Sequence, residues 1–507
     1  MTPRSNLPLA FALATLAACS DAPQSIGSQL TDDSGVVDPD AGAVTCEPGL
    51  DLCGGVCVDL QSPDQCGSCG NVCPAGANGA ARSCTAGKCT TGCKTGTRLC
   101  ASKNSCEKES ASSCGASCAV CPAPASNGYA LCDTGTCAIV CSAGYATCSS
   151  GCCATHVVDI ALGEGHACAL DVLGNVKCWG DDLNGQTGDG PTFHASNTAH
   201  ITAAPFQVAV PAAAQIAASS DRSCVILKTG EMMCWGYSGD GALGDPNAFN
   251  TNIPVYAKGV TAASAMGLGD QHTCAVQGGT VKCWGTNDYG QIGNNGSKVT
   301  KVTTPANVVG ITTAIAVTGG LHHTCALLSG GTVKCWGRAA VLGNPAVTVD
   351  SPVPVDVPGL SGITAISAGR SHTCALTSAG AIKCWGFGTS GELGNGLNAT
   401  SVAPVDVTLN GTATRISAGA YETCAILSTG GMQCWGENGY GQIGDGTILY
   451  RSVPTSNGLT ATGRIATGLY VACAVAADAT TRCWGSKGAI TRALASVLTP
   501  AVVTGLP

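Results

Sequence analysis

Residues 372–386, HTCALTSAGAIKCWG, contain two short apolar runs on either side of the polar turn Ser378-Ala379-Gly380. Runs of this kind around a glycine turn predict two antiparallel strands joined by a hairpin. The last three residues, Cys384-Trp385-Gly386, occur seven times in the chain. The seven copies begin at Cys178, Cys234, Cys283, Cys335, Cys384, Cys434 and Cys483.

The seven tryptophans of these copies are spaced 56, 49, 52, 49, 50 and 49 residues apart. In the fifth copy, four strand-like runs (TAISAG, TCALT, AIKCWG and APVDV) are separated by Gly, Ser, Asn or Pro turns. A period near 50 residues with several short strands per period is typical of propeller blades. We therefore predict an all-β fold in which residues 154–507 form a β-propeller with one blade per repeat.

Each copy has a second cysteine upstream, ten residues away in six copies and nine in the third. The nine-residue interval contains the two-residue hairpin turn Gly278-Gly279, whereas the longer intervals leave room for a three-residue loop that ends in a left-handed residue. The cysteines thus stay opposite each other while loop length changes, which predicts one disulfide across each hairpin. The predicted pairs are Cys168–Cys178, Cys224–Cys234, Cys274–Cys283, Cys325–Cys335, Cys374–Cys384, Cys424–Cys434 and Cys473–Cys483.

The motif around these cysteines extends further in both directions. Gly165-His166 precedes the first pair, the pattern Gly-x-Val-x-Cys-Trp-Gly ends at Gly180, and Asn184-Gly185-Gln186 follows. These residues resemble the regulator of chromosome condensation repeat, and the resemblance covers residues 154–507, although the fourth and seventh repeats lose most of the Gly-rich loop. It implies a seven-bladed propeller. Members of that family include guanine-nucleotide exchange factors and an inhibitor of β-lactamases, so the fold alone does not determine the function.

Residues 46–153 contain 20 of the 35 cysteines, in two and a half repeats of about 48 residues. Sets of eight, eight and four cysteines predict a small disulfide-rich module whose pairing the sequence leaves open. The stretch from Cys53 to Cys73 resembles the cysteine-rich stigma-specific protein family. The spacing of Cys66 and Cys69 also suits a zinc site, which we disfavour because this segment contains no histidine.

The N-terminus predicts export. Arg4 precedes an apolar run from Leu7 to Ala18, and Leu16-Ala17-Ala18-Cys19 resembles the lipobox of bacterial lipoproteins, in which the cysteine is lipidated. A plain secretory signal is the alternative. Residues 1–19 are then the signal peptide with its lipidation site, and residues 20–45, rich in Asp, Ser, Gly and Pro, are a flexible tether. We expect a membrane-anchored lipoprotein at the outer membrane or cell surface.

Composition and missing motifs argue against several classes of function. The net charge of −8 disfavours a nucleic-acid-binding surface, and the chain has no nucleophile elbow, phosphate loop or HExxH motif. We expect no enzyme activity, catalytic residue, cofactor or resident metal. His166, His272, His323 and His372 recur two residues before the first blade cysteine, which suggests a ring of metal ligands, but a turn-stabilising hydrogen bond is the favoured interpretation. Gly/Asp-rich loops such as residues 181–189 leave calcium as an alternative.

A binding or scaffold protein that uses its propeller loops is the leading hypothesis, and a regulator of another protein, by inhibition or nucleotide exchange, is the alternative. The export signal disfavours exchange, which requires a cytosolic GTPase. The loops after Trp-Gly differ most between repeats, and the first is the longest, over residues 181–205. We predict a partner-binding loop there, with Asp181, Phe193, His194 and His200. The partner protein and the oligomeric state stay open.

Overall fold

The computed structural model describes residues 156–190, 201–296, 301–486 and 496–506, together with short strands between residues 51 and 154. The chain divides into two compact units, Met1–Val120 and Cys121–Pro507. The only helical element among the described residues is one 3-10 turn, η1 (Ala339–Val341). Among the same residues, no helix has the length and apolarity needed to cross a bilayer.

The described strands of the first unit form three antiparallel hairpins. They are β1 (Asp51–Cys53) with β2 (Val56–Val58), β3 (Ala81–Thr85) with β4 (Lys88–Gly92), and β5 (Arg98–Cys100) with β6 (Ser105–Glu107). Two more hairpins belong to the second unit: β7 (Gly128–Asp133) with β8 (Thr136–Cys141), and β9 (Tyr145–Cys148) with β10 (Gly151–Ala154). Cys84, Cys132, Cys137 and Cys141 are disulfide-bonded.

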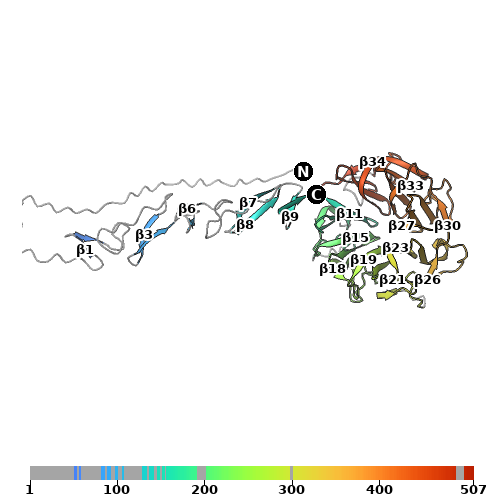
Figure 1. The fold of residues 1–507 in the computed structure, drawn as a ribbon, viewed down its shortest axis with the longest axis horizontal. Coiled ribbons are helices and arrows are strands. Elements are labelled where there is room, and N and C mark those ends of the chain that lie inside the picture. The colour runs from blue at the N-terminus through green and yellow to red at the C-terminus, as the bar shows by residue number, and fades with distance from the viewer. Residues whose placement is uncertain are drawn as a thin grey trace, which may run out of the picture. The chain divides into compact units, whose positions relative to one another are not determined.

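The rest of the second unit is a propeller of seven antiparallel blades, each with its strands in sequence order (Figure 1). The first three blades are β11 (Val157–Leu162), β12 (His166–Asp171), β13 (Val176–Asp181), β14 (Ile201–Gln207); β15 (Ala213–Ser219), β16 (Arg222–Leu227), β17 (Met232–Gly236), β18 (Thr251–Tyr256); and β19 (Ala263–Leu268), β20 (His272–Gln277), β21 (Thr280–Thr286), β22 (Lys301–Asn307). The next two are β23 (Ala314–Gly319), β24 (His323–Leu328), β25 (Val333–Gly337), β26 (Ser351–Asp356); and β27 (Ile363–Ala368), β28 (His372–Thr377), β29 (Ile382–Gly386), β30 (Ser401–Asp406).

The last two blades share one strand. They comprise β31 (Ala413–Ala418), β32 (Glu422–Leu427), β33 (Gly431–Gly436), β34 (Arg451–Thr467), β35 (Val471–Ala476), β36 (Thr481–Gly485) and β37 (Val497–Val502). The long strand β34 pairs with β33 through its first half and with β35 through its second half, so it ends the sixth blade and begins the seventh. The all-β propeller predicted from the repeats is confirmed.

In every blade the two cysteines face each other on the second and third strands and form a disulfide with Cα atoms 4.1 Å apart. The predicted change in turn length is also present. Gly278 and Gly279 have φ of +57° and +78°, as a two-residue turn requires, whereas the three-residue loop of the seventh blade ends in the left-handed Ala479 at φ +64°.

The core lies between the blades. Neighbouring residues of a strand point to opposite faces, so the Cys and Trp of one motif face different neighbours. Trp235 therefore packs in one buried cluster with Cys168 and Cys178 of the blade before it, and the same arrangement repeats around the ring. Trp179 of the first blade packs with Cys473 and Cys483 of the last, which closes the ring.

Candidate functional site

Two kinds of loop meet on one face of the propeller. The first and third strands of each antiparallel blade run in the same direction, so the loop after the first strand and the loop after the third lie at the same end. We call this end the loop face. The short hairpins that join the second and third strands, such as the one containing Val172, lie at the opposite end.

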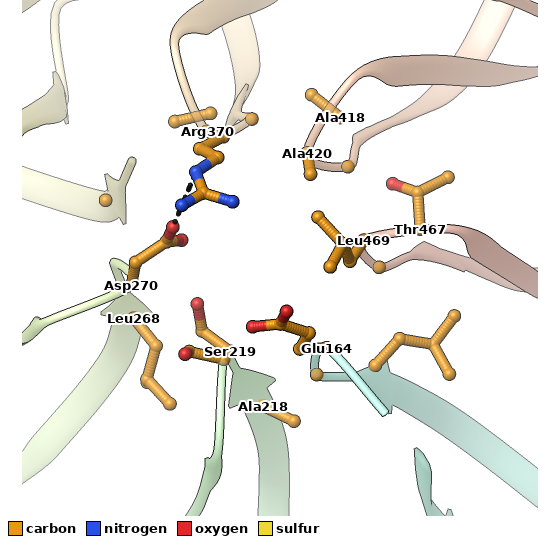
Figure 2. A pocket seen from close by; sticks show the side chains of 18 residues that line it. Glu164, Ala218, Ser219, Leu268, Asp270, Arg370, Ala418, Ala420, Thr467 and Leu469 are labelled. Atoms are coloured by element: carbon orange, nitrogen blue, oxygen red, sulfur yellow. Dashed lines mark ion pairs between the residues drawn. The ribbon is translucent and has the colours of Figure 1, made fainter. Parts of the chain in front are cut away.

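The ends of the seven innermost strands surround a central opening on the loop face, drawn in Figure 2. The side chains on its rim include Glu164, Ser220, Asp270, Arg370, Ala420 and Leu469. Backbone hydrogen bonds join adjacent blades around it, such as the one from the Glu164 N–H to the Ser220 carbonyl at 2.9 Å. Arg370 Nε lies 3.3 Å from Asp270 Oδ2, an ion pair that links the third and fifth blades past the fourth.

Negative charge gathers on the loop face of the first and second blades. Asp221 accepts a hydrogen bond from Asn184 Nδ2 at 3.2 Å, and it lies near Glu164 and Asp181. Burial, followed by repulsion from these two carboxylates, raises the pKa of Asp221 to about 6. This side of the opening therefore repels a further anion and attracts a cation.

Aromatic side chains form two clusters on the same face. In the first, the rings of Tyr289 and His322 have centroids 4.2 Å apart, and the Arg338 guanidinium lies 5.8 Å from the Tyr289 ring and 5.4 Å from the Phe387 ring. These distances are those of cation–π contacts. The second cluster consists of tyrosines on the sixth and seventh blades: the Tyr440 and Tyr470 centroids are 4.5 Å apart, and those of Tyr421 and Tyr470 are 6.3 Å apart.

The loops after the third strands expose large apolar side chains at their tips. Phe249 in the second blade is 85% exposed, Val349 in the fourth is 75% exposed, and Leu397 in the fifth is 61% exposed. In the sixth blade, Ile448 and Leu449 are adjacent and both exposed. We call these five residues the loop tips. These residues lie 12–14 residues after the motif tryptophan of their repeats. Together they form a distributed apolar surface of the kind found at binding sites.

The four recurring histidines lie between the blades and outside the central opening. Each is almost fully buried, and its Nε2 is 2.7–2.8 Å from a Ser or Thr hydroxyl of the next blade: His166–Ser223, His272–Thr324, His323–Thr373 and His372–Thr423. Burial lowers the pKa of three of them to about 3 and that of His372 to about 4. The histidines thus make a structural hydrogen bond, but the turn-stabilising role predicted from the sequence is wrong, because each bond joins neighbouring blades.

The Gly/Asp-rich loops are held by their own side chains. Asp182 Oδ1 accepts a hydrogen bond from the Thr187 N–H at 2.7 Å, and Asn438 Oδ1 accepts one from the Ile443 N–H at 2.9 Å. These bonds close each loop onto itself. Within the described part of the chain, no group of three His, Cys, Asp or Glu side chains is arranged to hold a metal ion.

Of the predicted partner loop, Asp181 ends β13 on the loop face, where its N–H donates to the Gly165 carbonyl at 2.8 Å. Phe193, His194 and His200 lie outside the described residues, as does Cys19. The aromatic clusters and the charged rim were missed from the sequence. Their signal is present, because Tyr289 and Tyr440 occupy the same position of their repeats, five residues after the motif tryptophan.

Comparisons with known proteins agree with this architecture. One family model of the regulator of chromosome condensation (RCC1) repeat matches residues 157–186, 213–242, 363–392 and 413–442, and a second matches residues 278–327 and 380–426. The Arabidopsis thaliana ultraviolet-B receptor UVR8 is 28% identical over 186 residues, 36% of this chain and 41% of the receptor. The match thus spans about two fifths of that relative.

Among solved structures, Prp20p of Saccharomyces cerevisiae, described with its binding properties to Gsp1p and histones, matches with a TM-score of 0.58 and 19% identity. The match covers 69% of this chain and 88% of Prp20p. Human WBSCR16 matches with a TM-score of 0.55 and 18% identity, covering 62% of this chain and 84% of that protein. At such low identities the likeness concerns the fold. Together with the repeat matches, it shows that this chain carries repeats of the regulator of chromosome condensation family and has that family's propeller fold.

Proposed function

We propose that this protein is a binding or scaffold protein without enzyme activity, and that it engages a partner protein through the loop face. The observation that carries the proposal is the set of loop tips. The second, fourth, fifth and sixth blades each expose a large apolar residue 12–14 residues after the motif tryptophan, while the blade hairpins are fixed by disulfides. A rigid scaffold with variable exposed loops is the usual arrangement of a recognition surface.

The first test replaces the loop tips. A propeller carrying Phe249→Ser, Leu397→Ser and Leu449→Ser should lose capture of its envelope partners in a pull-down by more than about tenfold, because interface energy concentrates in few buried apolar anchors. Its thermal stability should change little, since these side chains are exposed. Val172→Ser, which removes an exposed apolar residue from the opposite end of the first blade, is the matched control. Equal capture by the triple variant and the control would refute the proposed surface.

We also propose that the chain is exported and held at the outer membrane or cell surface by lipid on Cys19. The support comes from the sequence: an apolar run of signal-peptide length ends at Leu16-Ala17-Ala18-Cys19. Metabolic labelling with a palmitate analogue should mark the parent protein, and Cys19→Ala should abolish the label. Persistent labelling of the variant would contradict lipidation at this residue.

A regulatory role is the second candidate, supported by the kind of proteins that share the repeat. It makes a different prediction in the same pull-down. A regulator changes the activity of the captured partner in proportion to occupancy, whereas a scaffold leaves that activity unchanged.

A further inference from the structure

The two aromatic clusters of the loop face occupy equivalent places in the ring. Tyr289 belongs to the third blade and Tyr440 to the sixth, and the N–H of each donates to a glutamine side chain two residues later at 2.9 Å. Each tyrosine packs against an aromatic residue of the next blade, His322 in one case and Tyr470 in the other. A shift of three blades therefore superimposes the second cluster on the first.

Among the described residues, the cation of the first cluster has no counterpart in the second. The Arg338 guanidinium lies over the Tyr289 ring, and the backbone N–H of Arg338 donates to the His322 carbonyl at 2.9 Å. The residue that makes the same backbone contact in the seventh blade is Ser486, whose N–H donates to the Tyr470 carbonyl at 2.7 Å. The serine side chain is uncharged and too short to reach a neighbouring ring. Ser486 therefore places no cation at the position that the Arg338 guanidinium occupies in the first cluster.

The charges around the second cluster are inverted as well. The same three-blade shift replaces Arg370 by Glu164, Phe387 by Asp181 and Thr286 by Glu437. Glu164 is exposed and its carboxylate lies at the central opening (Figure 2). Among the described residues, neither Glu164 nor Glu437 has an ion-pair partner, and the Glu437 carboxylate accepts a hydrogen bond from the Tyr450 hydroxyl at 3.4 Å.

The electrostatics of Tyr470 agree with this distribution of charge. Burial, followed by the Glu437 carboxylate, raises the pKa of Tyr470, and Glu164 acts in the same direction. Both carboxylates therefore act on the ring that packs against Tyr440, the tyrosine that corresponds to Tyr289 and would face the missing cation. Tyr440 is 44% exposed, so the cluster is accessible from solvent.

We propose that Tyr440 and Tyr470, with Glu437 and Glu164, form a binding site for a cationic side chain of the partner, an arginine guanidinium placed as Arg338 is placed in the first cluster. The site rests on the proposed function, because it names the chemistry that the loop face recognises. Aromatic faces bind a cation through their quadrupole, and the carboxylates add charge complementarity without a covalent step.

The experiment titrates the full mature chain with the peptide Ac-Gly-Ser-Arg-Ser-Gly-NH2, followed by ligand-observed NMR. The same peptide with citrulline, which has the shape of arginine without its charge, should bind at least about fivefold more weakly. Tyr440→Leu should weaken arginine-peptide binding about fivefold. Tyr237→Leu removes an exposed tyrosine from the second blade of the same face and should leave binding unchanged.

The sharpest variant is Ser486→Arg. It gives the second cluster the arginine that the first cluster has, so the new side chain should occupy the proposed site. Peptide binding should then be lost, while the melting temperature stays unchanged. The double variant Lys487→Ala/Arg492→Ala removes the two cations that follow Ser486 in the sequence and should retain binding. Equal binding of the arginine and citrulline peptides, full binding by Ser486→Arg, or loss of binding in the double variant would each overturn the proposal.

The site and the proposed function can fail separately. Capture of a protein partner through the loop tips with no preference for arginine over citrulline would remove only the cation site. Arginine-selective peptide binding that is lost in Ser486→Arg, combined with unchanged capture by the loop-tip variant, would remove only the proposed apolar interface.

Discussion

Gly394→Ala is expected to lower the free energy of unfolding of the propeller by about 3 kcal/mol or more. A Cβ atom on Gly394 would lie 2.6 Å from Nε1 of Trp435, which is fully buried and donates to the Glu392 carbonyl at 2.9 Å. The indole is packed between two blades, so it cannot move away from the added methyl group. Overpacking of this kind costs about 1–3 kcal/mol, and an alanine at a positive φ adds about 1–2 kcal/mol.

Gly396→Ala separates these two causes. Gly394 and Gly396 both have left-handed φ, at +65° and +83°, but a Cβ on Gly396 would meet only Val453 Cγ1 at 3.7 Å. We expect this control to lose only the free energy that the left-handed backbone costs an alanine, about 1–2 kcal/mol. The measurement is urea denaturation followed by tryptophan fluorescence. Equal losses in the two variants would show that the close approach of glycine to the motif tryptophan does not matter.

The sequence predicts most of the blade because its signals are local. The Cys-Trp-Gly motif, the ten-residue cysteine interval and the turn glycines all lie within one hairpin, and the register pairs Cys374 with Cys384 directly. The long strand β34 was not foreseen. Its two halves pair with different blades, and Gly458 lies within it at a left-handed φ of +76°. The sequence suggests a turn at this glycine, but the strand continues on both sides of it.

The candidate site was less predictable for a physical reason. Rim and cluster residues lie in turns, where no periodic pattern distinguishes a side chain that faces the opening from one that faces solvent. The contact between Tyr440 and Tyr470 joins two blades, and that between Arg370 and Asp270 skips a blade. Such neighbours follow from the closure of the ring. Repeat alignment identifies equivalent positions, but the distances between them come only from the assembled propeller.

Glu422 is the outlier among the contacts that join neighbouring blades. Its position holds a histidine in four blades, and each histidine meets a Ser or Thr hydroxyl of the next blade. In the seventh blade the residue at the hydroxyl position is Ala472, which has nothing to donate. Glu422 is fully buried, and its Oε1 has no hydrogen-bond partner among the described residues. Burial raises the pKa of this carboxyl well above its usual value.

Glu422→Gln is therefore expected to stabilise the propeller at pH 8 and to have little effect at pH 4. A carboxyl whose native pKa lies above its unfolded value holds its proton more tightly in the folded state. The parent protein thus loses stability as the pH rises from the unfolded pKa, about 4.3, toward the native pKa. Glutamine does not ionise, so its advantage should grow over that range and exceed about 1.4 kcal/mol, the equivalent of one pKa unit.

Ala472→Thr tests whether the missing hydrogen-bond donor causes the raised pKa of Glu422. It gives the seventh blade the hydroxyl that the second to sixth blades have at this position. Glu422 then gains a donor to its charged form, and part of the pH dependence should disappear. Urea denaturation of the parent and both variants between pH 4 and pH 8 measures the effect. A stability difference between Glu422→Gln and the parent that is the same at every pH would mean that this carboxyl does not ionise within the range. The unpaired Oε1 would then be a packing defect without electrostatic consequence.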